Sequence, residues 1–178
     1  FISMGASALA CSLVSGNAVL EALKQEGFTN VTPVIVESER PAIPEGTELC
    51  YNRIHGTDGG DGGLQSYLEE LWIPYTGAGS VTSRNCFDKI LTKKAFFAAG
   101  VPTPADEIIK SGEMPTIGVP CVIKPPCEGS SVGVSIVKTE AELPAAVAEA
   151  AKYGTDLLVE EYICGKELTV AIFNGTAL

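Results

Sequence analysis

The spacing of hydrophobic and polar residues changes several times along this chain, and each change marks a predicted element. Three short apolar runs have the length of buried strands: residues 1–4, 31–36 and 49–54. Residues 15–25 have helical spacing, and Gly27 follows as a stop signal. The small residues at 5–13 are typical of a turn region. Strands that alternate with helices predict a parallel sheet, whose ligands bind beyond the carboxyl ends of the strands.

The middle of the chain has the pattern of consecutive helices. Residues 64–72 carry four residues at helical spacing, namely Leu64, Tyr67, Leu68 and Leu71. Residues 73–77 are predicted to be extended. Ser83 is the predicted N-cap of a helix that contains Asp88 and Lys89 and continues or restarts up to Gly100. The prolines at 102 and 104 mark the expected entry into a second domain.

A hairpin with a flexible tip is predicted next. The apolar run at 121–124 ends in Lys124, the loop 128–133 is rich in glycine and serine, and a second β-rich run occupies 134–137. Such a loop can lay backbone N–H groups against phosphate oxygens, because glycine permits a close approach, and Lys124 supplies positive charge. An ordinary hairpin loop beside a solvated lysine is the alternative.

The predicted second domain continues with a helix and a strand. Thr139 and Glu142 form a capping-box pattern, and Pro144 indicates that the helix is kinked or starts later. Residues 157–159 are predicted to be a short buried strand, and the acidic residues that follow it are read from composition alone as a charged strand end.

The glycine-rich segment 55–63, HGTDGGDGG, joins a predicted strand to a predicted helix. A helix entry of this kind offers N–H groups and the positive end of the helix dipole to an anion. His55 at the strand end is a candidate donor to a substrate carboxylate, while a mobile turn and a half-buried polar histidine are the alternatives. The spacing is not G-x-G-x-x-G, which argues against dinucleotide binding.

Composition limits the function classes. The 178 residues are 46% apolar and 19% charged, as in a globular protein of one domain or two small ones. The net charge of −10 argues against nucleic acid as a partner. The apolar runs are shorter than the ~20 residues of a membrane span, and the start lacks a basic signal-peptide region, so we expect a cytoplasmic protein without membrane contact. Six cysteines without a C-x-x-C pair indicate free thiols.

Four segments together resemble the ATP-grasp ligases, and within them the D-alanine:D-alanine ligases: NRIHGTDGGDGGLQSYLEELWIPYTGAG, DKILTKKAFFAAGVPTP, KPPCEGSSVGVS and LLVEEYICGKELTV. The resemblance covers almost the whole chain in the expected order. It implies an α/β fold with a Rossmann-like (pre-ATP-grasp) parallel-sheet domain at 1–80 and linking helices at 81–104. A small α+β ATP-grasp subdomain at 105–178 would follow, truncated before the second ATP-grasp lobe.

The resemblance also implies an activity and its residues. ATP would phosphorylate one D-alanine, and a second D-alanine would attack the acyl phosphate to give the dipeptide of peptidoglycan precursors. Ser130 and His55 would orient the substrates. The residues implied to bind the nucleotide are Lys89, Lys124, Glu128, Gly129, Ser131, Val132, Glu160, Glu161, Ile163 and Glu167. Partners would be ATP, D-alanine and in some cases a second subunit, with Mg²⁺ held by residues outside these 178.

The chain departs from the family pattern at three places. No acid precedes Glu21, where the family has a glutamate near the first substrate, and Gly60 replaces a second glutamate. The residues up to Leu178 lack the family's metal-binding acids, its arginine at the acyl phosphate and its covering loop. We therefore expect the 178 residues alone to form no dipeptide. A non-catalytic nucleotide-binding module and an ATP-grasp ligase for another amino acid or hydroxy acid remain alternatives.

Overall fold

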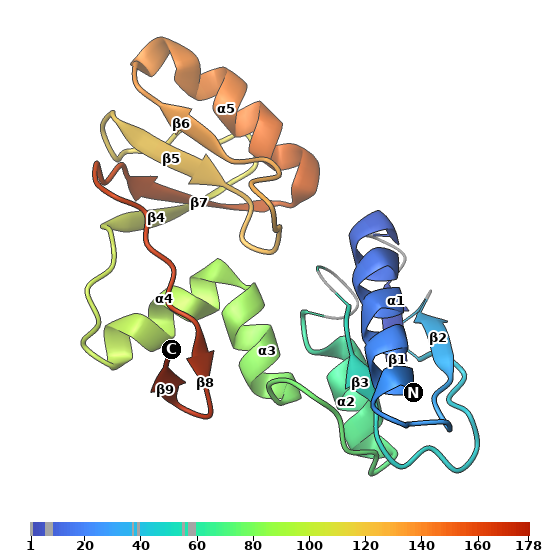
Figure 1. Cartoon of the computed structure of the whole chain (residues 1–178). Helices are drawn as coiled ribbons and strands as arrows, with labels where there is room; N and C mark the ends of the chain where they lie inside the picture. The colour runs from blue at the N-terminus through green and yellow to red at the C-terminus, as the bar shows by residue number, and fades with distance from the viewer. Residues whose placement is uncertain (1, 6–8, 37, 39, 55, 57–59) are drawn as a thin grey trace.

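The computed structural model describes residues 2–5, 9–36, 38, 40–54, 56 and 60–178. Within these ranges the chain forms two sheets joined by a pair of helices, and it finishes in a short hairpin (Figure 1).

The first sheet is parallel, as the alternating pattern predicts. Strands β1 (Ile2–Gly5), β2 (Pro33–Val36) and β3 (Tyr51–Asn52) lie in the order β2-β1-β3. Helix α1 (Leu9–Gln25) connects β1 to β2 and begins within the region predicted to be a turn. Leucine and alanine are strong helix formers, and this preference outweighs the small size of the residues there.

Helix α2 (Gly63–Glu70) packs on this sheet and completes the first core. Its buried apolar residues are Leu64 and Leu68, which lie against Val36, Cys50 and Ile54. The predicted apolar face does not extend to the helix end, because Leu71 is 42% exposed. After the helix the chain is extended, and Tyr75 forms a parallel bridge with Cys50 beside β3.

The helix predicted from Ser83 onward is two helices, so that prediction is wrong in its details. Helix α3 (Ser80–Phe87) has Gly79 at its N-cap position, four residues before the predicted N-cap Ser83. Helix α4 (Lys89–Ala98) follows after a break at Asp88, whose carboxylate accepts hydrogen bonds from the N–H groups of Ile90 and Leu91. An aspartate that caps a helix competes with helix continuation, which explains the break.

The second sheet is antiparallel and has the order β4-β7-β5-β6. Its strands are β4 (Asp106–Lys110), β5 (Cys121–Lys124), β6 (Ser135–Val137) and β7 (Asp156–Glu161). The predicted hairpin of β5 and β6 is confirmed. Strand β4 was not predicted, and β7 is longer than its predicted core.

Helix α5 (Leu143–Ala150) covers one face of the second sheet (Figure 1). The capping box of Thr139 and Glu142 is present, in the 3₁₀ turn η1 (Glu140–Glu142) that precedes it. The helix begins after that turn with Pro144 in its first turn, which confirms the predicted later start. A second 3₁₀ turn, η2 (Ala151–Tyr153), leads into β7.

The two faces of the second sheet have different chemistry. The face against α5 is apolar and holds the second core, which contains Ile109, Cys121, Ile123, Val137, Leu157 and Val159. Because side chains alternate along a strand, Lys124 and Glu160 point to the opposite face. The sequence therefore places charged groups on the face that α5 leaves uncovered.

The last eighteen residues lie on the surface. Side chains from Glu161 to Leu178 are exposed, and the segment contains the two-stranded hairpin of β8 (Ile172–Phe173) and β9 (Thr176–Ala177). Five cysteines of the described chain are free thiols, as predicted: Cys50, Cys86, Cys121, Cys127 and Cys164. In the part of the chain that the structure describes, no helix has the length and apolar character needed to cross a membrane.

Candidate functional site

Lys89 is fixed beside the glycine-serine loop by the break between α3 and α4. Lys89 is the first residue of α4. Its Nζ donates to the carbonyl oxygens of Pro126 at 3.1 Å and Glu128 at 2.5 Å. The pKa of Lys89 is lowered, chiefly because the ammonium group is partly buried and also because the positive charge of Lys124 repels it. Two ammonium groups therefore approach the same loop from different elements, which the sequence spacing alone did not establish.

Lys124 ends strand β5 on the face opposite α5 and forms an ion pair with Oε2 of Glu160. The other carboxylate oxygen, Oε1, accepts from Lys93 of α4 at 2.7 Å. Burial raises the pKa of Glu160, but hydrogen bonds and charge from Lys124 and Lys93 outweigh burial and lower it. Glu160 is thus an ionised, buried group that two lysines hold.

The three lysines differ in the donors that they have left for a ligand. A lysine ammonium has three N–H donors. Lys93 uses all three, on Thr103 Oγ1, Pro104 O and Glu160 Oε1. Within the described chain, Lys124 has Glu160 as its hydrogen-bonding partner and Lys89 has two carbonyls. Lys89 and Lys124 can therefore bind an anion, whereas Lys93 cannot do so without losing a bond.

The loop between β5 and β6 presents backbone N–H groups to solvent. Ser130 and Ser131 both have positive φ, 51° and 62°, and both are exposed. The loop closes on itself through the N–H of Val132, which donates to Gly129 O at 3.0 Å. No described residue accepts from the N–H of Ser130 or Ser131, so these groups are available to phosphate oxygens.

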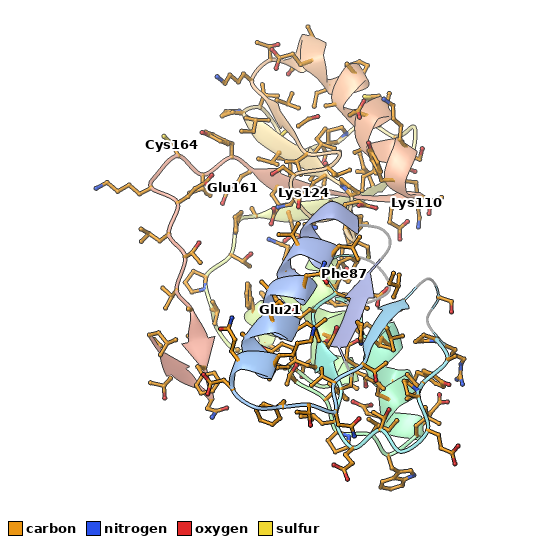
Figure 2. All side chains as sticks on the ribbon, turned by 45° about the vertical axis from the view of Figure 1, so that its right-hand side comes forward. Glu21, Phe87, Lys110, Lys124, Glu161 and Cys164 are labelled. Atoms are coloured by element: carbon orange, nitrogen blue, oxygen red, sulfur yellow. The ribbon has the colours of Figure 1, made fainter. Side chains whose placement is uncertain are left out.

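The residues predicted to bind adenosine have separate surroundings. Glu161 accepts the N–H of Ala105 at 3.0 Å, and its own N–H donates to the carbonyl of Ala105. Ile163 and Glu167 are exposed, whereas Glu160 is buried in the lysine network. In Figure 2, Lys124 and Glu161 are labelled on the side of the second sheet that is nearer to Phe87.

The glycine-rich segment is only partly described, and His55 lies outside the described residues. At its end, the carboxylate of Asp61 accepts the N–H of Gly63 at 3.0 Å. Gly62 at the N-cap has φ of 92°, and a Cβ there would collide with the carbonyl of Ser80. A carboxylate of the chain itself therefore occupies one donor at the helix entry predicted to bind an anion.

One cavity of about 530 Å³ connects both predicted loops. Asp61 and Gly63 line it from the glycine-rich side, and Cys127 and Glu128 line it from the phosphate-loop side. Phe87 and Asp88, where α3 gives way to α4, form part of its wall. The structure thus brings segments that are more than sixty residues apart in sequence to one cavity, beside Lys89.

Sequence reasoning missed Lys93 and Asp106. Lys93 lies four residues after Lys89, one helical turn along α4, so helical spacing gave the only available signal. Asp106 pairs with Lys93 at 3.2 Å from a strand that was not predicted. The described residues contain no group of three or more His, Cys, Asp or Glu side chains arranged to hold a metal.

Comparison with known sequences locates the chain among ligases. The family model described as D-ala D-ala ligase C-terminus matches residues 94–177. A D-alanine–D-alanine ligase from Desulforudis audaxviator is 42% identical over 174 residues, covering 92% of this chain and 56% of the relative. The ligase of Geobacter sulfurreducens is 40% identical, covering 94% of this chain and 55% of that protein.

Solved structures agree in fold. The crystal structure of D-alanine–D-alanine ligase from Bacillus anthracis superposes with a TM-score of 0.88 at 29% identity, over 99% of this chain and 61% of that one. Its complex with ATP gives a TM-score of 0.87 at 28% identity, over 99% and 62% of the two chains. The fold that this chain shares with them is that of D-alanine–D-alanine ligases. The chain belongs to the D-alanine–D-alanine ligase family, and it spans about half the length of the curated relatives it matches.

Proposed function

We propose that this chain carries the nucleotide-binding part of an ATP-dependent ligase that joins two D-alanines for peptidoglycan synthesis in the cytoplasm. The observation that carries this proposal is the approach of Lys89 and Lys124 to one glycine-serine loop with donors to spare. The names of the relatives and the ATP complex of a structural neighbour support it.

In the proposed reaction, a carboxylate oxygen of the first D-alanine attacks the γ-phosphorus and ADP leaves with the former bridging oxygen. The amine of the second D-alanine then attacks the acyl carbon, loses a proton and expels phosphate. Lys89, Lys124 and the loop N–H groups stabilise charge on the phosphates, because preorganised donors need no rearrangement as charge develops. Ser130 and His55 orient the amino acids. Mg²⁺ would further neutralise the phosphates, and we assign it no ligand within the described residues.

The remaining binding roles follow from position along the chain. Glu128, Gly129, Ser131 and Val132 form the loop that would lie against the phosphates. Glu161 and Ile163 would contact the purine through their backbone, and Glu167 would accept from the ribose hydroxyls. Glu160 acts in a different way, because both of its oxygens are already engaged by lysines.

We also propose three parts for the chain: a Rossmann-like domain at 1–80, linking helices at 81–104 and an ATP-grasp subdomain at 105–178. Two separate cores support this division. One contains residues between Val34 and Tyr75, and the other contains residues between Ile109 and Val159.

Replacement of Lys124 tests the nucleotide site. Lys124→Ala should weaken ADP binding about tenfold or more, because a charge-assisted bond to phosphate is lost. Lys138→Ala is the matched control, since Lys138 lies beyond β6, and it should bind as the native chain does. Isothermal titration calorimetry with ADP measures both, and thermal unfolding verifies that each variant is folded. Equal affinities in the two variants would remove the phosphate role of Lys124.

A second candidate, a ligase for another acceptor or a non-catalytic module, is favoured by the environment of Gly60. A Cβ at Gly60 would lie 3.0 Å from the carbonyl of Gly56 and 3.6 Å from Phe87, so the segment packs without a side chain there. Phosphate release should be measured with D-alanine, with other amino acids and with hydroxy acids. Release with D-alanine supports the first candidate, and release with another acceptor supports a different ligase. ADP binding without release is expected both of the module and of these 178 residues alone, so it does not separate the module from the first candidate.

A further inference from the structure

Lys93 is the most constrained charged side chain near the candidate site. Its side chain is 8% exposed, and its three donors are used on acceptors at 2.7, 2.8 and 2.7 Å. These acceptors belong to the linker after α4 and to β7. The group therefore ties three segments together and has no donor left for a ligand.

The strand register explains why a cation is needed there. Asp106 of β4 lies directly opposite Glu160 of β7, and like charges in that position destabilise a sheet. Lys93 contacts both carboxylates, at 3.2 and 2.7 Å. On the other side of β7, Val122 lies opposite Glu160, and Lys124 two residues further along β5 takes the second oxygen.

We propose that Lys93 is a positioning residue for the nucleotide site, which it serves without touching the nucleotide. Lys93 holds one oxygen of Glu160, so that the other oxygen fixes the ammonium of Lys124 beside the phosphate loop. This inference rests on the proposed nucleotide-binding function.

Loss of Lys93 would disturb Lys124 in two ways. The freed oxygen of Glu160 would compete for the remaining lysine, and Lys124 alone would offset the repulsion between Glu160 and the facing Asp106. Lys124 would then have to be reoriented when a phosphate binds. Preorganisation of this kind contributes to affinity because ordering a long side chain costs free energy.

A double-mutant cycle separates this role from general destabilisation. Lys93→Met should weaken ADP binding about tenfold in the native background but less than about twofold when Lys124 is already alanine, because residues that act through one another are not additive. Lys94→Met is the matched control, since Lys94 is the exposed neighbour on α4, and it should leave affinity unchanged. Equal losses in both backgrounds, or no loss, would overturn the proposal.

A measurement without nucleotide keeps the test independent of the proposed function. The ¹³C signal of the Glu160 carboxyl should titrate at higher pH in Lys93→Met than in the native chain, because one of its two cationic partners is gone while Lys124 and Asp106 remain. Lys94→Met should leave the titration in place. If the native chain binds no ADP, the proposed function fails, and the carboxyl titration alone decides whether Lys93 positions Glu160.

A milder variant covers the case in which Lys93→Met does not fold. Thr103→Val removes one acceptor of Lys93 and leaves every charge in place. It should shift the Glu160 titration and the ADP affinity in the same direction as Lys93→Met, by a smaller amount. An unchanged titration of Glu160 in this variant and in folded Lys93→Met would overturn the positioning role.

Discussion

Glu160 illustrates how one residue can be both buried and charged. Its side chain is 9% exposed, and desolvation alone would favour the neutral acid. Lysines on both oxygens reverse that preference, so the carboxylate stays ionised. Removal of one member of such a network leaves an uncompensated buried charge. The resulting loss of folding free energy is larger than the stability that the intact network has over an apolar core of the same shape.

Glu160→Gln should therefore destabilise the fold by about 3 kcal/mol at neutral pH. The folded pKa lies below the ordinary 4.5, so the stabilisation by native Glu160 is complete above that pH and is lost as pH falls through the folded pKa. The difference in free energy of unfolding between Glu160→Gln and the native protein should accordingly become smaller as the pH falls. Urea unfolding of both proteins at a series of pH values measures this difference.

Glu161→Gln is the matched control for this prediction. Glu161 is the exposed neighbour on β7 and accepts one backbone N–H, from Ala105. Its replacement should cost less than about 1 kcal/mol. A difference in free energy of unfolding between Glu160→Gln and the native chain that stays constant at all pH values would contradict the role assigned to the ionised carboxylate.

For single residues, the sequence indicated candidate side chains for the site but did not indicate which side chains they contact in the fold. Lys89, Lys124 and Ser130 could be selected because of their places beside a glycine-rich loop and their match to a family pattern. The buried pairing of Glu160 could not be predicted, because it depends on the register of β4, β7 and β5. Composition gives no access to that register.

Among the elements, the loop between β5 and β6 depends on one glycine for its geometry. Gly133 has φ of 68°, and a Cβ there would lie 2.7 Å from Cδ2 of Tyr153 and 3.0 Å from Pro125. The close approach anchors the exit of the loop against η2. Gly129, at the entry of the loop, has no neighbour within 4 Å of such a Cβ.

Gly133→Ala should destabilise the chain by about 2 kcal/mol, because both the backbone angle and the space are unfavourable for a side chain. Gly129→Ala should change stability by less than about 0.5 kcal/mol. Chemical denaturation of the two variants compares them directly. A destabilisation by Gly129→Ala equal to that by Gly133→Ala would show that the entry of the loop is as constrained as its exit.

Periodicity and turn residues predicted most elements, and the errors have identifiable causes. The β5–β6 hairpin, the capping box at Thr139 and the stop at Gly27 follow from local chemistry, and the structure confirms all three. The prediction that a helix runs unbroken through Asp88 was wrong, because an aspartate can interrupt a helix by capping the next one. Strand β4 was missed because only one of its five residues is buried.

At the scale of the whole molecule, two cores lie on either side of helices α3 and α4 (Figure 1). The first core is centred on Leu64 and Leu68, and the second is covered by α5. The cavity beside the phosphate loop has walls from both sides of the break at Asp88. A site lined by segments that flank two cores depends on the relative placement of those cores, which sequence patterns do not encode.

Leu68→Ala and Leu157→Ala test whether the two cores unfold separately. Each leucine is fully buried, and each truncation should cost about 3 kcal/mol by leaving a cavity. If residues 1–80 and 105–178 are distinct domains, hydrogen exchange measured by mass spectrometry should accelerate in α2 and its sheet for Leu68→Ala. It should accelerate in β5, β7 and α5 for Leu157→Ala, because local stability follows the core that was damaged. Each variant serves as the control for the other, and equal loss of protection in both halves for either variant would show one cooperative unit instead of the proposed domains.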